Sequence, residues 1–179
     1  MEPQKAETHA QNLWFIEPKY TTIQFSVRNL FFFTVKGCFT DFTGTLVRDE
    51  DDIRRSSVQA AIKTASIDTG NKRRDDHLLS ADFLDAGKYS EIYFQSTSVE
   101  KGRDRDTLKV TGALTFKGIS RELVLDVTEV DESRSPQGEQ VAYYAALAEI
   151  DRFDFGVSWG RGLIGRKLSV TIQVQATKK

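Results

Sequence analysis

Apolar and polar residues alternate with a period of two along much of this 179-residue chain, and this alternation limits what the chain can fold into more than any other feature. Successive side chains of a β-strand point to opposite faces, so alternation is typical of a strand with one buried and one solvated face. The clearest segments span residues 22–28, 107–117 and 167–175, and weaker ones span 58–62, 92–96 and 123–127. Their number and spacing predict an all-β chain of about eight strands.

The alternation changes parity in the segment 35–47. Apolar residues keep one parity up to Phe39 and the other from Phe42 onward. A long strand changes parity in this way when it absorbs an extra residue, which predicts a bulge near Thr40 or Asp41. Bulges bend long strands around the wall of a barrel. Eight strands can pack as two flat sheets or close into a barrel, and we expect a single antiparallel β-barrel.

Glycines share the inward-facing parity with bulky apolar residues. Gly37, Gly44 and Gly112 lie in mid-strand, where glycine usually marks a bend or the close approach of another group. The interior of an eight-stranded barrel is just wide enough to be filled by side chains or to hold one small ligand. Small inward residues leave room for an apolar guest, whose burial gains about 25 cal/mol per Å². The 12 phenylalanines of the chain could equally fill that space, so both alternatives stay open.

One short part of the chain has a helical pattern. It spans residues 71–80, and residues 81–85 are predicted to form a second short turn that Asp82 could cap. We therefore expect one or two short helices in a connection near residues 71–86. Charged or turn-forming residues predict further turns at 49–52, 101–104 and 133–138.

The predicted strand at 141–148 departs from the alternation. Tyr143 and Tyr144 lie on opposite faces, and alanine occupies most of the other positions. Both faces of the strand therefore look dry. A loop or a chain terminus could cover it, or it could form a contact between subunits.

The chain has no linker, internal repeat or low-complexity tract, so one domain is expected over residues 13–179, behind a flexible polar tail of residues 1–12. No secretory signal is visible, and no run approaches the roughly 18 apolar residues that a membrane helix needs. The lone cysteine, Cys38, cannot form an intrachain disulfide and fits a reducing compartment. We therefore expect a cytoplasmic protein without a membrane span; a periplasmic location would require a signal removed from this chain.

Charge and motif content argue against several classes of function. The chain has 25 basic and 26 acidic residues, a balance that disfavours a nucleic-acid partner. It contains no Gly-x-Ser-x-Gly, P-loop or Gly-x-Gly-x-x-Gly motif. His9 and His77 are its only histidines, too few for an ordinary metal site. Asp151 and Asp154 are expected to cap and brace the backbone rather than to act in acid–base chemistry. We predict no catalytic residue, no metal and no cofactor.

Several segments in a fixed order carry a family resemblance. They are 23–30 (IQFSVRNL), 35–39 (VKGCF), 42–44 (FTG), 65–71 (ASIDTGN), 74–78 (RDDHL), 82–85 (DFLD), 112–118 (GALTFKG) and 150–157 (IDRFDFGV). On these segments the chain resembles the YceI-like polyisoprenoid-binding proteins over residues 13–174. The resemblance implies a lipocalin-like antiparallel barrel that holds one long isoprenoid or fatty-acyl molecule in its interior. It also implies a homodimer and export to the bacterial periplasm, which are common in that family.

The chain also departs from the family pattern. The family commonly has a histidine in the turn before the first long strand and another after a Val-Arg or Val-Lys pair. Here those places hold Tyr20 or a neighbour, and Asn29. If the family's histidines contact a ligand head group, this chain prefers a different head group.

The inward-facing apolar residues are the candidates for the wall of a lipid-binding cavity. They are Ile23, Phe25, Val27, Leu30, Phe39, Phe42, Leu114, Phe116 and Trp159. The candidates for contacting a ligand head group are Arg28, Asn29, Arg74 and His77. An arginine in the cluster 73–77 could bind a phosphate or carboxylate through paired N–H donors. The favoured alternative is that this cluster caps the helix and pairs with itself. Trp159, with Phe153 and Phe155, could cover a ligand's tail or plug the barrel.

These observations lead to one hypothesis and two alternatives. The hypothesis is non-catalytic binding of an isoprenoid or fatty-acyl lipid, for carriage, storage or sequestration. The first alternative is an interaction or structural protein with a filled core. The second, less favoured, is an enzyme that acts on an isoprenoid.

Overall fold

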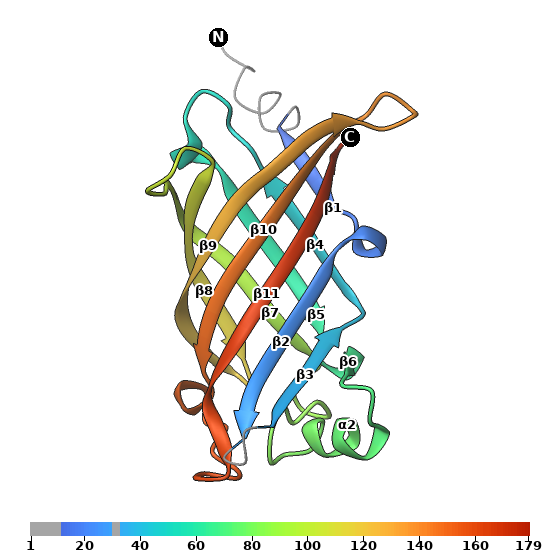
Figure 1. Ribbon diagram of the computed structural model, residues 1–179, viewed down its shortest axis with the longest axis vertical. Coiled ribbons are helices and arrows are strands. Elements are labelled where there is room, and N and C mark those ends of the chain that lie inside the picture. The colour runs from blue at the N-terminus through green and yellow to red at the C-terminus, as the bar shows by residue number, and fades with distance from the viewer. Residues whose placement is uncertain (1–11, 30–32) are drawn as a thin grey trace.

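The alternating segments form one antiparallel sheet that closes into an elongated barrel, with its strands tilted against the long axis (Figure 1). The computed structural model describes residues 12–29 and 33–179, so nearly all of the predicted tail lies outside the described residues. The strands are β1 (Leu13–Ile16), β2 (Thr22–Asn29), β3 (Thr34–Phe39), β4 (Phe42–Val47), β5 (Ser57–Lys63), β6 (Ile67–Asp68), β7 (Glu91–Lys101), β8 (Thr107–Phe116), β9 (Ile119–Arg134), β10 (Gln140–Asp151) and β11 (Ile164–Lys178). The helical segments are η1 (Pro18–Tyr20), η2 (Ile53–Arg55), η3 (Thr64–Ser66), α2 (Lys72–Leu78) and η4 (Arg152–Phe155).

Closure of the barrel depends on the short strand β1. It pairs with β4 on one side, where Trp14 lies opposite Leu46, and with β11 on the other, where Trp14 lies opposite Lys178. The closed ring therefore runs β1, β4, β5, β7, β8, β9, β10 and β11, which confirms the predicted antiparallel barrel of eight strands. β2, β3 and β6 extend the wall toward the end of the barrel that carries α2 (Figure 1).

The predicted irregularity at residues 40–41 lies between β3 and β4. The neighbouring strand is interrupted at the same level, where η3 separates β5 from β6. Backbone hydrogen bonds still bridge the two interruptions: Thr40 N donates to Ser66 O at 3.2 Å, and Lys63 N donates to Asp41 O at 2.9 Å. At this level the side chains that face inward shift by one position and the wall bends, while the neighbouring strands stay connected by hydrogen bonds.

An α-helix lies where the sequence predicts one. α2 falls within residues 71–80, and Asn71 caps it by accepting a hydrogen bond from Arg74 N at 3.1 Å. The segment after α2 forms turns, but Asp82 does not cap them. Its carboxylate instead lies 2.8 Å from Nε2 of His77, back in α2. No helix in the described part of the chain is long and apolar enough to cross a bilayer.

The connection after α2 covers one end of the barrel interior. Phe83 and Leu84 lie in this connection and are each 8% exposed. They belong to the main apolar cluster, together with Phe155 and Val157 from the segment between β10 and β11. Two loops far apart in the sequence therefore meet at the α2 end of the barrel.

The alanine-rich strand β10 is covered from inside at its first residues. Ala142 is 1% exposed and packs with Trp14 and Ala176, because β1 pairs with the end of β11 there. The start of β10 is therefore covered by a segment near a chain terminus, which explains why it is apolar at Ala142. A contact between subunits through this strand stays a prediction; Leu147 is exposed on its outer face.

Candidate functional site

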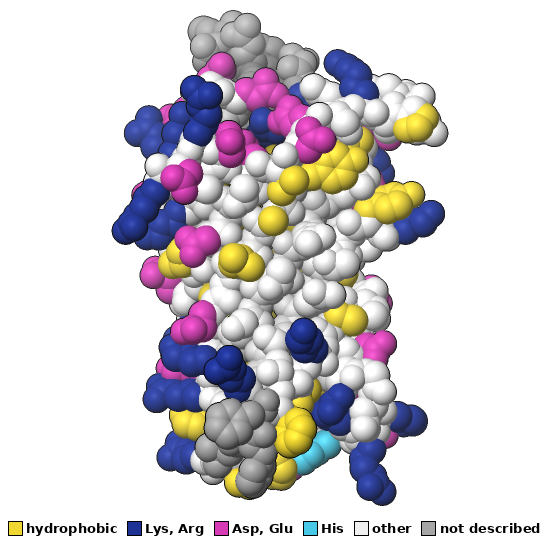
Figure 2. Space-filling model, in the orientation of Figure 1, with side chains coloured by type: hydrophobic (Ala, Val, Ile, Leu, Met, Phe, Trp, Pro, Cys, Tyr) yellow, Lys and Arg dark blue, Asp and Glu magenta, His cyan; other side chains and the backbone are white. Residues whose placement is uncertain are grey.

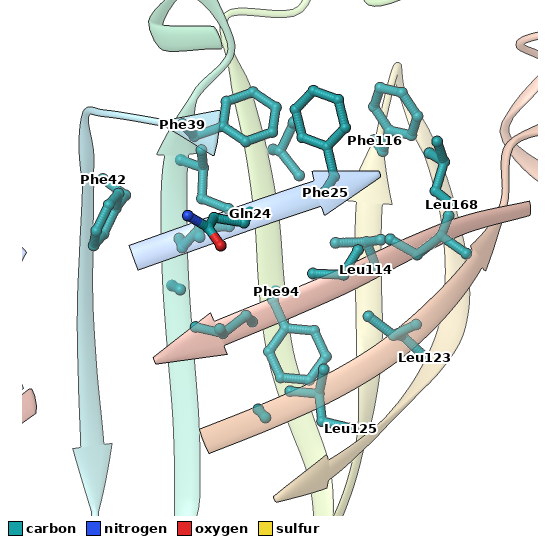
Figure 3. Close-up of a pocket in the computed structure, with 18 of the residues that line it drawn as sticks. Gln24, Phe25, Phe39, Phe42, Phe94, Leu114, Phe116, Leu123, Leu125 and Leu168 are labelled. Carbon is teal, nitrogen blue, oxygen red and sulfur yellow. The ribbon is translucent and has the colours of Figure 1, made fainter. Parts of the chain in front are cut away.

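A cavity of about 510 Å³ runs inside the barrel. Every strand of the closed ring contributes to its lining, which is nearly all apolar between Arg48 at one end and Trp159 at the other. Figure 3 shows Phe25, Phe94 and Leu114 extending their side chains toward it from β2, β7 and β8. The phenylalanines therefore do not fill the interior, contrary to the filled-core alternative.

The structure brings the predicted wall residues together around this cavity. Those that line it are Ile23, Phe25, Val27, Phe39, Phe42, Leu114, Phe116 and Trp159. Leu30, which was also predicted, lies outside the described residues. Alternation places these side chains because the inward parity of a closed barrel is the lining of its interior. Their contact with a ligand stays a prediction.

The mid-strand glycines do not provide the empty space. An added Cβ would meet Phe25 at Gly37, Ile16 at Gly44 and Phe94 at Gly112. At Gly112 the distance to the Phe94 ring would be only 2.5 Å. The expectation that these glycines leave room for a guest is therefore wrong, because a neighbouring large side chain lies against the backbone at each of them.

Polar groups gather at the α2 end of the cavity. Arg74 lines the cavity and donates from Nε to Thr69 Oγ1 and from Nη2 to Thr69 O, both at 2.8 Å. Asp75 accepts a hydrogen bond from Thr69 N at 3.0 Å. His77 also lines the cavity and pairs with Asp82. These contacts hold α2 against the end of β6, which supports the alternative that the cluster braces this connection.

The three aromatic residues before β11 have separate positions. Trp159 lines the cavity and is 45% exposed, and its ring centroid lies 4.5 Å from that of His77. Phe155 is buried in the core, 5.3 Å from the ring of Phe116. Phe153 lies beneath arginine guanidinium groups instead. Phe155 therefore fits the alternative in which these aromatic residues plug the barrel. Trp159 stands at the α2 end of the cavity, and whether it covers part of a ligand stays a prediction.

A buried arginine at the same end was not predicted as part of the site. Arg152 is 3% exposed and lines the cavity. It donates hydrogen bonds of 2.8 to 3.1 Å to the carbonyl oxygens of Val157, Trp159, Ile164 and Gly165. Burial lowers the pKa of its guanidinium group. Arg152 thus holds the loop before β11 in place and puts a positive charge beside the cavity.

The remaining head-group candidates, Asn29 and Arg28, lie on opposite sides of the wall. Asn29 lines the cavity, and its Oδ1 is buried without a hydrogen-bond partner in the described ranges. Arg28 is exposed and is not among the residues that line the cavity. Adjacent residues of a strand face opposite sides, so the wall cannot direct both side chains inward.

A second polar group stands at the opposite end of the cavity, and the sequence analysis missed it. Arg48 forms an ion pair with Glu132, donates to Tyr144 Oη at 3.4 Å and lies 5.7 Å from the ring centroid of Trp14. Glu129 lines the cavity beside them. Burial raises the pKa of the Tyr144 phenol. The sequence pattern could have identified Arg48 as a cavity residue, because it continues the alternation by which the inward-facing side chains of β4 are spaced.

The arginine and histidine side chains that line the cavity are engaged with the protein itself. Arg74 and Arg152 donate to backbone or hydroxyl oxygens, and Arg48 and His77 each face a carboxylate. In the part of the chain that the structure describes, no group of three or more His, Cys, Asp or Glu side chains is placed to hold a metal ion. The cavity therefore combines an apolar wall with polar side chains at both of its ends.

Similarity to known proteins extends over nearly the whole barrel. A family model described as a YceI-like domain matches residues 14–176. Protein YceI of Escherichia coli O157:H7 is 32% identical over 163 residues, which cover 91% of this chain and 84% of that protein. The crystal structure of a Campylobacter jejuni YceI protein superposes with a TM-score of 0.73 at 29% identity, over 81% of this chain and 85% of that one. A polyisoprenoid-binding domain from Saccharophagus degradans shares the fold, with a TM-score of 0.67 at 13% identity, over 93% and 98% of the two chains.

Proposed function

This chain belongs to the YceI-like domain family, and on that basis we propose that its barrel binds one long apolar lipid, an isoprenoid or a fatty-acyl derivative. The lipid is carried, stored or sequestered, and it leaves the barrel chemically unchanged. The observation that carries the proposal is the elongated apolar cavity.

The size and lining of the cavity support a lipid as its occupant. Its volume of about 510 Å³ lies within the roughly 300–1,000 Å³ of ordinary ligand pockets. An apolar chain gains about 25 cal/mol for each Å² that it buries, whereas a polar molecule would lose hydrogen bonds to water along the same wall. An apolar wall selects its guest by length and width more than by hydrogen bonds, which suits a flexible hydrocarbon chain.

The relatives supply the class of lipid. The domain from Saccharophagus degradans is described as polyisoprenoid-binding, and it shares the barrel fold with this chain. We carry that ligand class over to this chain as part of the proposal, because the cavity here is lined by apolar side chains from every strand of the closed ring.

The α2 end is where we place a polar head group. Arg74, His77 and Arg152 line this end, and Asn29 adds a buried amide oxygen. A guanidinium with donors to spare binds phosphate or carboxylate oxygens well. Arg74 uses two nitrogens on Thr69 and keeps further N–H groups for a ligand. The opposite end combines Arg48 with carboxylates, which suits an anionic head group less well.

The proposal includes no reaction on the bound lipid, because the ionisable side chains at the α2 end already contact other groups of the protein. Acid–base catalysis needs a side chain within hydrogen-bond reach of the reacting atom and free to move its proton. Arg74 and Arg152 donate their N–H groups to oxygen atoms of the protein, and His77 is paired with Asp82. An added isoprenoid should therefore be recovered intact after incubation with the protein.

The experiment that tests the proposal is mass spectrometry of the purified protein and of its organic extract. We expect one long-chain species in a near-equimolar amount, and native spectra with a matching increase in protein mass. A protein that is free of lipid, and stays so after incubation with isoprenoids and fatty-acid derivatives, would contradict the proposal. Turnover of the added lipid would favour the enzyme alternative.

A further inference from the structure

Three large apolar side chains are exposed together at the α2 end of the barrel. Phe33 is 71% exposed, Leu163 is 58% exposed and Trp159 is 45% exposed. Strand pairing brings them to one rim: Asn29 N donates to Phe33 O at 2.8 Å, and Asn29 lies opposite Ile164 in β11, next to Leu163. Large apolar side chains in such a group mark an interaction surface more often than isolated ones do.

Basic residues belong to the same end of the barrel as this apolar group, and one of them, Arg161, lies 4.8 Å from the ring centroid of Phe153. Arg28 precedes Asn29 on the outer wall, Arg161 lies in the loop between Trp159 and Leu163, and Arg73 stands one helical turn before His77 on α2. Within the described residues, none of these three arginines forms an ion pair. On the face drawn in Figure 2, Lys and Arg side chains gather toward this end and carboxylates toward the other.

The carboxylates near this rim leave the positive charge largely uncompensated. Asp76 lies against Lys72 and Asp82 against His77, so neither carboxylate forms an ion pair with the three arginines. Asp154 in η4 is an exposed carboxylate of the same end. We call Phe33, Trp159, Leu163, Arg28, Arg73 and Arg161 together the docking tip.

We propose that the docking tip binds the surface of an anionic lipid bilayer, and that lipid passes between the bilayer and the cavity there. Apolar side chains flanked by unpaired arginines match the two layers of such a surface, an acyl region beneath a negatively charged head-group region. Trp159 joins the tip to the cavity, because it is exposed and also lines the cavity. The passage of lipid rests on the proposed function, whereas the docking does not.

A second copy of this chain fits the tip less well than a bilayer does. A twofold contact would place the same surface of two copies face to face and bring arginine against arginine. A bilayer that contains anionic lipids offers the opposite charge and an apolar layer at the same time. The bilayer is therefore the occupant that both the charge and the exposed apolar side chains favour.

Vesicle co-sedimentation of the full chain tests the docking. We expect binding to vesicles of phosphatidylcholine mixed with phosphatidylglycerol, little binding to phosphatidylcholine alone, and weaker binding as salt increases. The pair Arg73→Gln/Arg161→Gln should lower the partition coefficient about tenfold or more, since each arginine near an anionic surface contributes a several-fold factor. Phe33→Ser/Leu163→Ser should have a similar effect through lost insertion.

Matched controls come from the opposite end of the barrel. Arg103→Gln/Arg105→Gln removes the same charge from exposed positions there, and Val130→Ser removes a side chain that is 61% exposed. Both should bind anionic vesicles as the unchanged protein does. Equal loss in tip and control variants, or no binding to anionic vesicles at all, would overturn the proposal. So would a change of oligomeric state in the tip variants by sedimentation, because it would make a second copy the occupant.

Lipid analysis of the same preparations separates this proposal from the proposed function. A protein that carries lipid but does not bind anionic vesicles would refute the docking and the passage of lipid through it, and would leave the proposed function standing. A protein that binds vesicles through the tip but never contains lipid would refute the lipid-binding cavity and the passage, and would leave the docking standing. The tip variants Phe33→Ser/Leu163→Ser should still take up lipid from detergent solution, because neither residue lines the cavity.

Discussion

Leu114 lies on the inner face of β8, beside the cavity and 7% exposed (Figure 3). Leu114→Trp should fill part of the cavity and lower the lipid-bound fraction seen by native mass spectrometry by about tenfold. The barrel should still fold, since overpacking costs about 1–3 kcal/mol in a filled core and this site borders free space.

The adjacent residue provides the control for this variant. Ala113 belongs to the same strand but faces outward, opposite Gln95 and Glu122. Ala113→Trp introduces the same indole side chain outside the barrel and should leave lipid uptake unchanged. Normal lipid content in Leu114→Trp would show that this part of the wall does not contact the ligand.

Arg152 is the residue whose removal should destabilise the barrel most directly. Arg152→Met deletes a buried cation and leaves several carbonyl oxygens without their donor, so the free energy of unfolding should fall by about 3–5 kcal/mol. Arg152→Lys should not restore it, because an ammonium cannot reproduce the planar set of donors. Urea denaturation measures both. Arg121→Met, at an exposed arginine of the same end, should change the stability by less than about 0.5 kcal/mol.

Sequence patterns identified the wall residues but not Arg152, and the physical reason is local. Inward parity in regular strands translates directly into cavity lining, as for Leu114. Arg152 lies in η4, where no period of two or 3.6 applies, and a charged residue beside Asp151 is usually solvated. Its burial depends on four carbonyl groups that converge only after the loop before β11 has folded.

At the scale of elements, two aspartates order the connection between β4 and β5. Asp49 Oδ1 accepts from Asp52 N at 2.8 Å, and Asp52 Oδ1 accepts from Arg54 N at 3.1 Å. The N–H of Asp52 lowers the pKa of the Asp49 carboxyl, and the side chain of Arg54 lowers that of Asp52. Because both pKa values lie below the ordinary 3.8, this connection should keep its order near neutral pH and lose it as the pH falls through the folded-state values.

NMR titration of the carboxyl carbons measures this effect. We expect midpoints below 3.8 for Asp49 and Asp52, and a parallel loss of amide protection at residues 49–56. In Asp49→Asn the amide protection should be weaker at neutral pH and should change less on acidification. A midpoint at or above 3.8 for Asp49 would contradict the hydrogen bonds that order the connection.

The strands and the helix could be predicted because each has its own local pattern, but two features of the elements could not. β1 consists of four consecutive apolar residues without alternation, and we did not predict it as a strand. The interruption of one wall strand by η3 also has no periodic signal, although Thr64 there is 1% exposed. Both depend on partners distant in sequence, which a pattern along the chain does not contain.

At the scale of the whole molecule, closure and the open interior depend on contacts between distant parts of the chain. Trp14 joins β1 to β4 and β11, and so connects the two ends of the sequence. Alternation predicted an inward face but could not decide whether it was filled. Whether the interior is filled or open depends on where each phenylalanine ring lies. The ring of Phe94, for example, lies against the backbone of Gly112. The eight-stranded barrel was therefore predictable from the sequence, whereas the space inside it depends on packing that only the folded structure defines.

An apolar cavity that binds lipid also makes the stability of the whole barrel depend on its guest. A ligand that binds only the folded state adds about 2.7 kcal/mol at 100 times its Kd. For a chain of 179 residues this corresponds to a rise in Tm of about 5–10 °C. Protein stripped of lipid and refolded should melt at a lower temperature than the purified form. Added isoprenoid should raise the Tm again, in proportion to the logarithm of its concentration.

Leu114→Trp should show no such rise in Tm, while Ala113→Trp should behave as the unchanged protein does. Differential scanning calorimetry measures each Tm, and identical values with and without lipid would show that the cavity is not coupled to folding through a bound guest.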